Sequence, residues 1–514
     1  MRVKTEALSA MWHNLKERPV LAAGVVFLAA LAVYVPTLAP GLLWGGGDFA
    51  TFQTKAFTRQ IESNVFGHPL WVVLAQPFVA LPIGDVAFRA NLTSAVFASA
   101  ALAFVFLAAQ RITNKTGASL LATGVIMVSH SFWTYAVMPK PYSLNALMLA
   151  ACTYFVVRWG HEKRGRDLYL FATLYGLSLL NHLVMLTAAA GFLVFIVLVA
   201  RRAVEARRQA AVAGVIYLAA LLPYLLLVAN AGEGEGTGAT IGAFLRGFAT
   251  ALTSPAALVL GLAAGATLLV YQFMFSLPVG LVGVHRSWQT DRSIAALLLL
   301  IALGNVSFLL GATDPRTGGE YVWNLHYYLM TYMVFGLWIA IGFAHLWPRL
   351  TRTRLRQAAS LALFMAVPVT VYAVAPTIAR PLATNLPGFR ELGGRDNLTY
   401  ALSPWKHNET GARSFAEGIL AALPPNSTLF ADYSIWTVVN YLQVVEGARP
   451  DVKLHKLPGT RTYQQLPFIL ERAHTDSLYI ADVNRYYDLA DIQTRFDVVP
   501  AGLIYELIPR QAPE

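Results

Sequence analysis

Apolar segments long enough to cross a lipid bilayer recur along the first three quarters of this 514-residue chain. A helix rises about 1.5 Å per residue, so roughly 20 apolar residues span a hydrocarbon core about 30 Å thick. Charged residues make up only 13% of the chain, about half the share of a soluble domain. The pattern predicts a polytopic α-helical membrane protein with about eleven spans, near residues 20–39, 86–109, 117–137, 142–158, 167–182, 184–200, 210–229, 255–281, 293–311, 327–346 and 358–378.

The basic residues between these segments predict an orientation. With the N-terminus in the cytoplasm, the cytoplasmic segments hold 20 Lys and Arg residues, whereas the loops on the opposite side hold six. Cytoplasmic loops carry the excess of Lys and Arg, so the bias supports this orientation and an odd number of spans. The C-terminus is then expected outside. The predicted cytoplasmic segments are 1–19, 111–115, 158–166, 201–209, 285–292 and 348–357.

The pattern changes after residue 378. Residues 379–514 hold 13 Lys and Arg against 15 Asp and Glu, whereas residues 1–378 hold 26 against 13. The basic excess therefore belongs to the membrane part and does not indicate nucleic-acid binding. We predict a transmembrane domain at 1–378 and a soluble extracytoplasmic α/β domain with a mixed or parallel sheet at 379–514. Strand-like runs near 426–434, 451–459, 477–483 and 496–509 alternate there with helical runs near 410–423, 434–447 and 462–473.

Asp48 is placed differently from the other acids on the predicted outer side. It follows the first span within about ten residues, in PGLLWGGGDFATFQ, and precedes FATFQTKAFTRQI, which is predicted to be an amphipathic helix at the interface. The three glycines before it allow backbone conformations that are closed to other residues. Asp48 is a candidate catalytic base, and capping of the following helix is an equally weighted alternative. One such carboxylate and a single cysteine, Cys152, give no basis for predicting a metal site or a cofactor.

Several cationic residues map to the same outer boundary. Ionisable groups at membrane depth are costly and usually functional, although each one alone is more often an interfacial anchor or a buried core histidine. Together with an acid, they are what transfer from a phosphate-linked donor requires: the acid takes the acceptor proton, and the cations stabilise the departing phosphate. Lys55 and Arg59 are expected one turn apart on one helix face. The full set of candidates is Lys55, Arg59, His68, Lys140, His182 and His326.

Five segments, in order, resemble the protein O-mannosyltransferase-like family of multi-spanning class C membrane glycosyltransferases. The resemblance covers nearly the whole chain and implies a class C bundle with its site at the outer face and a sugar on a polyprenyl phosphate as donor. It implies Asp48 as the general base and adds Asn181, beside His182, to the substrate-binding candidates. The segments are PGLLWGGGDFATFQTKAF, GHPLW with LPIGDVAFRANLTSAVFASAAL, SFWTYAVMPKPYSLNAL, GLSLLNHLVML, and ALPPNSTLFADYSIWTVVNYLQVVEGARPDV with AGLIYELIP.

The sequence departs from the family pattern at two places. The family usually has a second acid shortly after the first, where Thr51 stands here, or else Asp48 is that second acid and Gly46 replaces the first. Lys140 stands where a glutamate is common. These departures bear on the choice of base more than on the fold.

We therefore predict an integral, multi-pass membrane glycosyltransferase, with a bacterial inner membrane as the expected location. It would move a sugar, mannose being one candidate, from a polyprenyl-phosphate donor to an extracytoplasmic hydroxyl, such as protein Ser/Thr, with inversion. Its partners would be the lipid bilayer, the donor, and a protein or glycan acceptor. One alternative is a transporter or flippase, which explains the spans but not the C-terminal domain. Another is a non-catalytic partner of a glycan-assembly system, which would fit the missing second acid.

Overall fold

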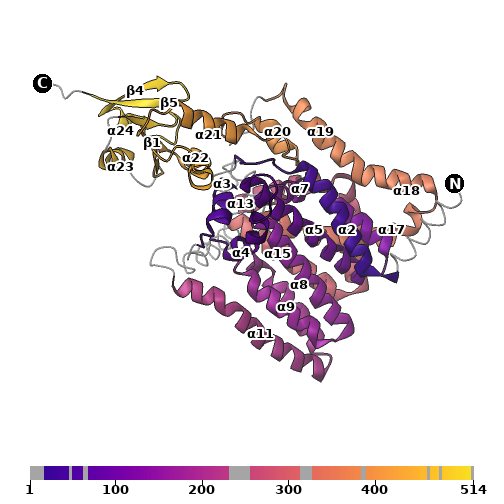
Figure 1. The fold of residues 1–514 in the computed structure, drawn as a ribbon. Coiled ribbons are helices and arrows are strands. Elements are labelled where there is room, and N and C mark those ends of the chain that lie inside the picture. Colours follow the sequence, from indigo (N-terminus) through magenta and orange to yellow (C-terminus); the bar gives the residue numbers. More distant parts are fainter. Residues whose placement is uncertain are drawn as a thin grey trace.

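The protein is a helical bundle with a small sheet domain at one end, seen here in a computed structural model (Figure 1). The structure describes residues 17–44, 49–61, 67–230, 255–312, 327–383, 389–459, 464–473 and 477–510. The bundle helices are α2 Pro19–Tyr34, η1 Val35–Thr37, α3 Phe49–Thr58, α4 Pro69–Val79, α5 Val86–Thr113, α6 Thr116–Met127, α7 His130–Ala136, α8 Tyr142–Glu162, α9 Gly165–Ser178, η2 Leu183–Ala188, α10 Ala189–Ala200, α11 Val204–Ala229, α13 Pro255–Phe273, η3 Met274–Ser276, α14 Leu277–Thr290, α15 Arg292–Ala312, α17 Leu329–Leu350, α18 Arg354–Leu361, η5 Ala362–Ala366 (a π-helical turn) and α19 Val367–Ala379.

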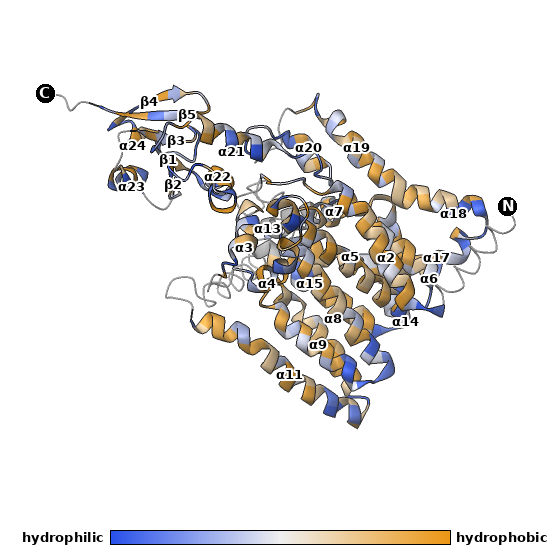
Figure 2. Cartoon of the chain, in the orientation of Figure 1, coloured by the Kyte–Doolittle hydropathy of each residue, from blue (hydrophilic) through white to orange (hydrophobic). Residues whose placement is uncertain are grey.

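Helices occupy each of the eleven segments that hydropathy predicts as spans. Among the described residues, seven helical stretches are long and apolar enough to cross a membrane. Only 11% of the most apolar part of α11 is buried inside the protein, and Val215 on it is 69% exposed. So large an exposed apolar surface needs lipid around it. Figure 2 shows apolar residues along the bundle helices and polar residues at their ends. The chain is therefore an integral multi-pass membrane protein, while the number eleven stays a prediction.

Several boundaries differ from those predicted. The span expected at 117–137 is two helices, α6 and α7, because Val128 and Ser129 leave the helical conformation between them. The basic segment expected as a loop at 285–292 is helical as far as Thr290, where α14 ends. The apolar stretch at 167–200 is broken at Asn181 and His182, as predicted, between α9 and η2.

Several helices in the bundle approach one another closely at glycines. A Cβ atom added to Gly283 of α14 would collide with the carbonyl oxygen of Trp338 of α17, and one added to Gly342 of α17 would collide with the carbonyl oxygen of Val279. The backbones of α14 and α17 are therefore in direct contact, which is the way small residues bring membrane helices together. Gly304 of α15 meets the backbone of Thr187 in η2 in the same manner.

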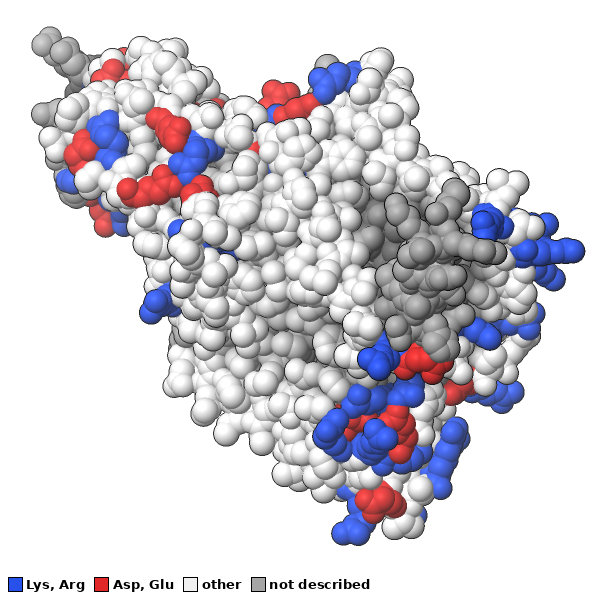
Figure 3. Space-filling view, turned by 45° about the vertical axis from the view of Figure 1, so that its right-hand side comes forward, with Lys and Arg blue, Asp and Glu red and all other residues white. Residues whose placement is uncertain are grey.

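The basic segments gather at one end of the bundle, which we call the basic end. It comprises the described parts of segments 111–115, 158–166, 201–209, 285–292 and 348–357. Arg111 pairs with Glu162 across two of these segments, and Arg202 donates to Ser293, which directly follows segment 285–292. Figure 3 shows the Lys and Arg side chains collected there. The basic segments can gather at one end only if the chain returns to that end between successive pairs of spans. The fold is therefore consistent with the cytoplasmic segments predicted from the distribution of Lys and Arg.

The sheet domain carries a five-stranded mixed sheet in the order β2-β1-β3-β5-β4. β1 is parallel to β2 and β3, whereas β5 is antiparallel to β3 and β4. The mixed sheet predicted from alternating strands and helices is confirmed. Its elements are α20 Asn397–Leu402, α21 Gly411–Ala422, β1 Thr428–Ala431, α22 Tyr433–Glu446, β2 Lys453–Lys456, α23 Gln465–Arg472, β3 Leu478–Ile480, α24 Leu489–Ile492, β4 Phe496–Ala501 and β5 Ile504–Pro509.

The sheet domain is joined to the end of the bundle opposite the basic end, which we call the docking end. Trp44 of the first loop donates its indole N–H to the carbonyl of Gly393 at 2.9 Å and accepts from the Tyr400 hydroxyl at 2.5 Å. Asp85, which caps α5, forms an ion pair with Arg413 of α21 at 3.0 Å. The first loop thus lies between the two parts, and it packs in the core of the sheet domain through Leu42 and Trp44. The division at residue 378 stays a prediction, although α19 ends nearby.

Candidate functional site

The helix that follows the candidate acid is fixed by a buried amide pair. Gln53 of α3 donates to the carbonyl of Gly41 at 3.1 Å and to the side chain of Asn91 in α5 at 2.9 Å. Asn91 in turn donates to the carbonyls of Ala39 and Gly41. Both amides are fully buried, where unpaired polar groups are costly. The network therefore holds the start of the first loop against α3, on either side of residues 45–48.

The expectation that Lys55 and Arg59 share one helix face is wrong. Lys55 is buried in α3, with its ammonium group 5.8 Å from the ring centroid of Phe52. The helix ends at Thr58, and Arg59 takes a positive φ of 58° and is exposed. A left-handed residue at a helix end turns the chain away, so the i, i+4 relation no longer applies. Lys55 stays with the candidate site, whereas Arg59 is exposed beyond the end of α3.

Asn181 joins two turns that are distant in sequence. Its side-chain N–H donates to the carbonyl of Pro141 at 3.0 Å, and its backbone carbonyl accepts from Nδ1 of His68 at 2.5 Å. The backbone N–H of Leu70 also bonds to the carbonyl of Leu180 at 3.2 Å. His68 itself has a left-handed backbone, with φ of 49°, and begins α4 directly before Pro69. The His-Pro turn, the Lys140-Pro141 turn and the Asn-His break therefore form one hydrogen-bonded unit.

The hydrogen bonds assign a tautomer to each histidine. Nδ1 of His68 faces a carbonyl, which can only accept, so Nδ1 carries the proton. Nδ1 of His182 accepts from the N–H of Val184 at 3.1 Å, so its proton is on Nε2. The two rings lie 5.0 Å apart, centroid to centroid. The N–H group of His68 is therefore used by the carbonyl of Asn181, whereas the Nε2–H group of His182 is a suitable donor to an anionic oxygen.

Lys140 and two tyrosines complete the cluster. The ammonium group of Lys140 lies 5.0 Å from the ring of Phe49 and 5.6 Å from that of Tyr142. The ring of His182 lies 5.4 Å from Tyr142 and 5.8 Å from Tyr327. Aromatic faces attract cations. The site thus holds a cation among aromatic rings beside Phe49, the residue that follows Asp48 in the sequence.

The structure brings together Lys55, His68, Lys140, Asn181 and His182 from four separate segments, and Arg59 is the described candidate that it does not include. Asp48 and His326 lie outside the described residues, so the roles predicted for them stay predictions. Sequence reasoning missed Tyr142 and Tyr327. Both stand next to predicted residues, in MPKPYSLN and WNLHYYLM, and an aromatic residue beside a candidate cation was the available signal. Among the described residues, no group of three or more His, Cys, Asp or Glu side chains is arranged to hold a metal ion.

A second polar cluster lies at the carboxyl edge of the parallel strands in the sheet domain. Arg390 bonds both oxygens of Asp432, which follows β1, at 2.6 and 3.0 Å, and Asp482, which follows β3, at 2.9 Å. Burial opposes the charge on Arg390, but the two carboxylates outweigh it and raise the guanidinium pKa. The hydroxyl of Tyr487 donates to Asp432, and burial together with this carboxylate raises the pKa of that hydroxyl. This edge is where ligands usually bind in α/β sheets.

Aromatic residues line the same edge and face the bundle. The rings of Tyr433 and Trp436 stack at an interplanar angle of 15°, and the ammonium group of Lys456 lies 5.3 and 5.6 Å from them. The hydroxyl of Tyr433 lies 3.3 Å from that of Thr51 in α3. We call Tyr433, Trp436 and Lys456 the aromatic edge. Through Thr51 the aromatic edge contacts α3, and Phe49 of the same helix lies against Lys140.

A lipid-exposed bundle, a docked sheet domain and a cation cluster at their junction define the class of protein: an integral membrane protein with the class C glycosyltransferase fold. The fold is similar to the crystal structure of ArnT from Cupriavidus metallidurans in the apo state, with a TM-score of 0.59 at 13% sequence identity, over 94% of this chain and 97% of that one. The apo oligosaccharyltransferase from Archaeoglobus fulgidus aligns with a TM-score of 0.48 at 10% identity, over 91% of this chain and 69% of that one.

The family match is more specific than the fold. Residues 64–206 match the family described as the protein O-mannosyl-transferase TMEM260 N-terminal domain. This segment includes the His-Pro turn, Lys140 and the Asn-His pair, which are three of the features on which the sequence resemblance rests. The resemblance to O-mannosyltransferase-like proteins is thereby confirmed over residues 64–206.

Proposed function

We propose that this protein is a membrane glycosyltransferase that moves a sugar from a polyprenyl-phosphate donor to a hydroxyl of an extracytoplasmic acceptor. The observation that carries the proposal is the cluster of Lys140, His68 and His182 at the docking end, built by the segments that match the O-mannosyl-transferase family. The ArnT-like fold supports the same class of enzyme.

The cluster is suited to a departing phosphate. Phosphate leaves as an anion, and fixed N–H and ammonium donors stabilise that charge as it develops. Lys140 supplies an ammonium group, while the Nε2–H group of His182 supplies a dipole whose direction is set by the bond from the N–H of Val184 to Nδ1. Tyr142 is buried, with its ring 5.8 Å from that of Tyr327, and charge interactions are stronger in such partly desolvated surroundings.

We further propose Asp48 as the general base. The acceptor hydroxyl would lose its proton to Asp48 and attack the anomeric carbon opposite the phosphate, which inverts the configuration. Phe49, its neighbour in the chain, lies against Lys140, so the sequence position of Asp48 suits this role. In this scheme the basic end faces the cytoplasm and the sheet domain is extracytoplasmic, as the distribution of Lys and Arg indicates.

The aromatic edge of the sheet domain is the proposed acceptor surface. Stacked aromatic rings with a flanking ammonium group can bind either the face of a sugar or an extended peptide, so a glycan or a protein acceptor with a Ser or Thr hydroxyl fits this chemistry. The contact between Tyr433 and Thr51 connects this surface to α3. Mannose is the sugar that the family name suggests for the first test.

The experiment is sugar transfer from a radiolabelled polyprenyl-phosphate-mannose donor in membranes that contain equal amounts of wild-type and variant protein. Asp48→Asn should abolish transfer. Lys140→Met should lower the rate about 10²- to 10³-fold, the usual effect of removing a donor to a developing anion. Arg510→Gln, which removes an exposed charge paired with Asp497, is the matched control and should retain activity.

Three outcomes would contradict parts of the proposal. Transfer that survives Asp48→Asn would leave Asp48 as a structural cap and require another base. Transfer that survives Lys140→Met would separate the cation cluster from catalysis. No transfer by the wild-type protein from any of a panel of polyprenyl-phosphate sugars would favour a non-catalytic partner.

A further inference from the structure

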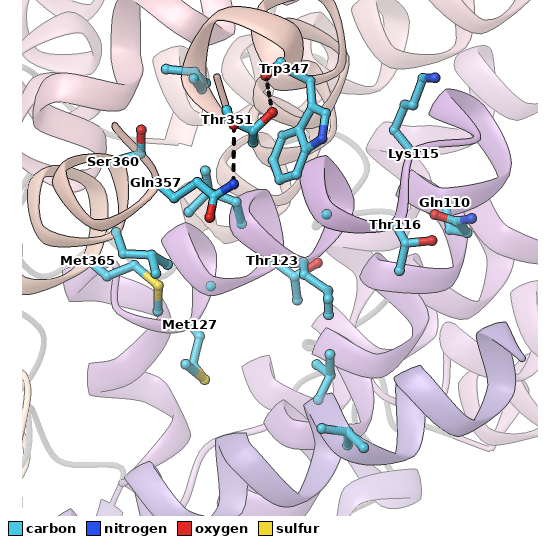
Figure 4. Close-up of a pocket in the computed structure, with 18 of the residues that line it drawn as sticks. Gln110, Lys115, Thr116, Thr123, Met127, Trp347, Thr351, Gln357, Ser360 and Met365 are labelled. Carbon is cyan, nitrogen blue, oxygen red and sulfur yellow. Dashed lines mark hydrogen bonds between the residues drawn. The ribbon is translucent and has the colours of Figure 1, made fainter. Parts of the chain in front are cut away.

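A pocket of about 1040 Å³ opens at the basic end of the bundle, far from the cluster at the docking end (Figure 4). Its walls come from α2, the end of α5, α6, the end of α17, and α18 with η5. The volume is at the upper end of the range for ligand pockets, about 300–1,000 Å³. Nothing in the proposed transfer reaction uses it.

The lining changes character along the pocket. Toward the basic end it is polar, and Lys115 is its charged member, with no acid among the described lining residues. Deeper in the bundle it is apolar. α6 runs from Thr116 to Met127, which at about 1.5 Å per residue carries the wall roughly 18 Å from the basic end. The polar lining includes Gln110, Asn114, Lys115, Thr351 and Gln357, and the apolar lining includes Val25, Ala29, Leu120, Leu121, Met127 and Met365.

Two features indicate that the pocket opens to the lipid and offers a buried acceptor. Val25 and Leu361, on opposite walls, are 46% and 54% exposed, so the pocket opens sideways where lipid would surround the bundle. The side-chain oxygen of Gln110 is buried and has no hydrogen-bond donor among the described residues. A buried acceptor of this kind is costly unless a donor reaches it.

We propose that this pocket binds one anionic glycerophospholipid from the adjacent leaflet. The phosphate would lie at Lys115, and a hydroxyl of a glycerol headgroup would donate to the oxygen of Gln110. An acyl chain would extend along α2 and α6 past Ala29 toward Met127. The charge at one end and the apolar depth at the other match this ligand, and the basic residues of segments 111–115 and 348–357 attract anionic lipid to this end.

The first test fills the apolar part of the pocket with a large side chain. Ala29 is an exposed lining residue of α2, so Ala29→Trp fills the pocket without disturbing a packed core. Ala32 is exposed on the same helix and does not line the pocket, so Ala32→Trp is the matched control. Delipidated protein would be titrated with phosphatidylglycerol and the bound lipid counted by native mass spectrometry. Ala29→Trp should lower the affinity at least tenfold, while Ala32→Trp matches the wild type.

The second test examines the headgroup. Lys115→Gln should reduce the preference for phosphatidylglycerol over phosphatidylcholine about fivefold, the effect of one Lys at an anionic surface. Arg352→Gln, an exposed cation outside the pocket, should leave that preference unchanged. The proposal is overturned if both lipids bind equally to the wild type, if the two Trp variants bind alike, or if a polyprenyl phosphate displaces phosphatidylglycerol at substoichiometric amounts. None of these readouts depends on sugar transfer.

Discussion

Replacing Gly283 by alanine tests the direct backbone contact between α14 and α17. The new methyl group would collide with the carbonyl oxygen of Trp338, which belongs to the backbone of α17 and cannot rotate away. Overpacking of this kind costs about 1–3 kcal/mol, and a rigid backbone partner places it at the upper end. The higher helix propensity of alanine returns about 1 kcal/mol. We expect a net loss of about 2 kcal/mol.

The control is Gly214→Ala in α11, where no atom lies within 4 Å of the added Cβ. At Gly214 the substitution changes only the helix propensity, so the free energy of unfolding should stay the same or rise by up to about 1 kcal/mol. Thermal unfolding of the two purified variants in one detergent, followed by loss of the monodisperse peak, gives the comparison. Gly283→Ala should melt a few degrees below the wild type. Equal melting of the two variants would refute the close contact.

Two further predictions concern the sheet domain. Trp436→Leu removes one ring of the aromatic edge and should raise the KM for the acceptor about tenfold with little change in kcat. The control is Trp288→Leu, at an exposed tryptophan of α14, which should change neither constant. A fall in kcat alone would contradict an acceptor role for Trp436. Partial burial opposes the charge on Asp396, but hydrogen bonds from Thr399 and the charge of Arg380 outweigh it and hold the pKa of this carboxyl below its usual value. Its contribution to stability is therefore present above the pKa of the unfolded carboxyl, about 3.9, and is lost as the pH falls through the lower folded value. Proteolysis of the junction between α19 and α20 should increase below about pH 4 in the wild type and stay nearly constant with pH in Asp396→Asn.

The main features of the fold were predictable because the membrane imposes simple rules. Segments must be long and apolar to cross lipid, and basic loops must return to one side, so hydropathy and Lys/Arg counts locate helices well. The alternation of strands and helices after residue 378 predicted the mixed sheet for a similar reason. Neither rule reports where an apolar helix breaks. After the interruption at Val128 and Ser129, the N–H groups of His130 and Ser131 donate to the side chains of Tyr372 and Gln272, partners that lie far away in the sequence.

The candidate site was only partly predictable. His68, Lys140 and His182 stood out because ionisable groups are rare near membrane segments, and the structure brings them together. The prediction that Arg59 shares a helix face with Lys55 was wrong because it assumed that the helix continues, whereas α3 ends at Thr58. Tyr142, Tyr327, Tyr433 and Trp436 carry no charge, so they look like ordinary apolar positions until tertiary structure places them beside a cation.

Asn181 ties together three turns that are spread over more than a hundred residues of the chain, and this has a consequence for how such sequences vary. His68 needs the carbonyl of Asn181, and the turn at Pro141 needs its amide group. A change in any one turn therefore alters what the other two require. In a set of related sequences the His-Pro, Lys-Pro and Asn-His pairs should be gained and lost together, and a chimera that exchanges one of them should misfold locally unless the other two come from the same parent.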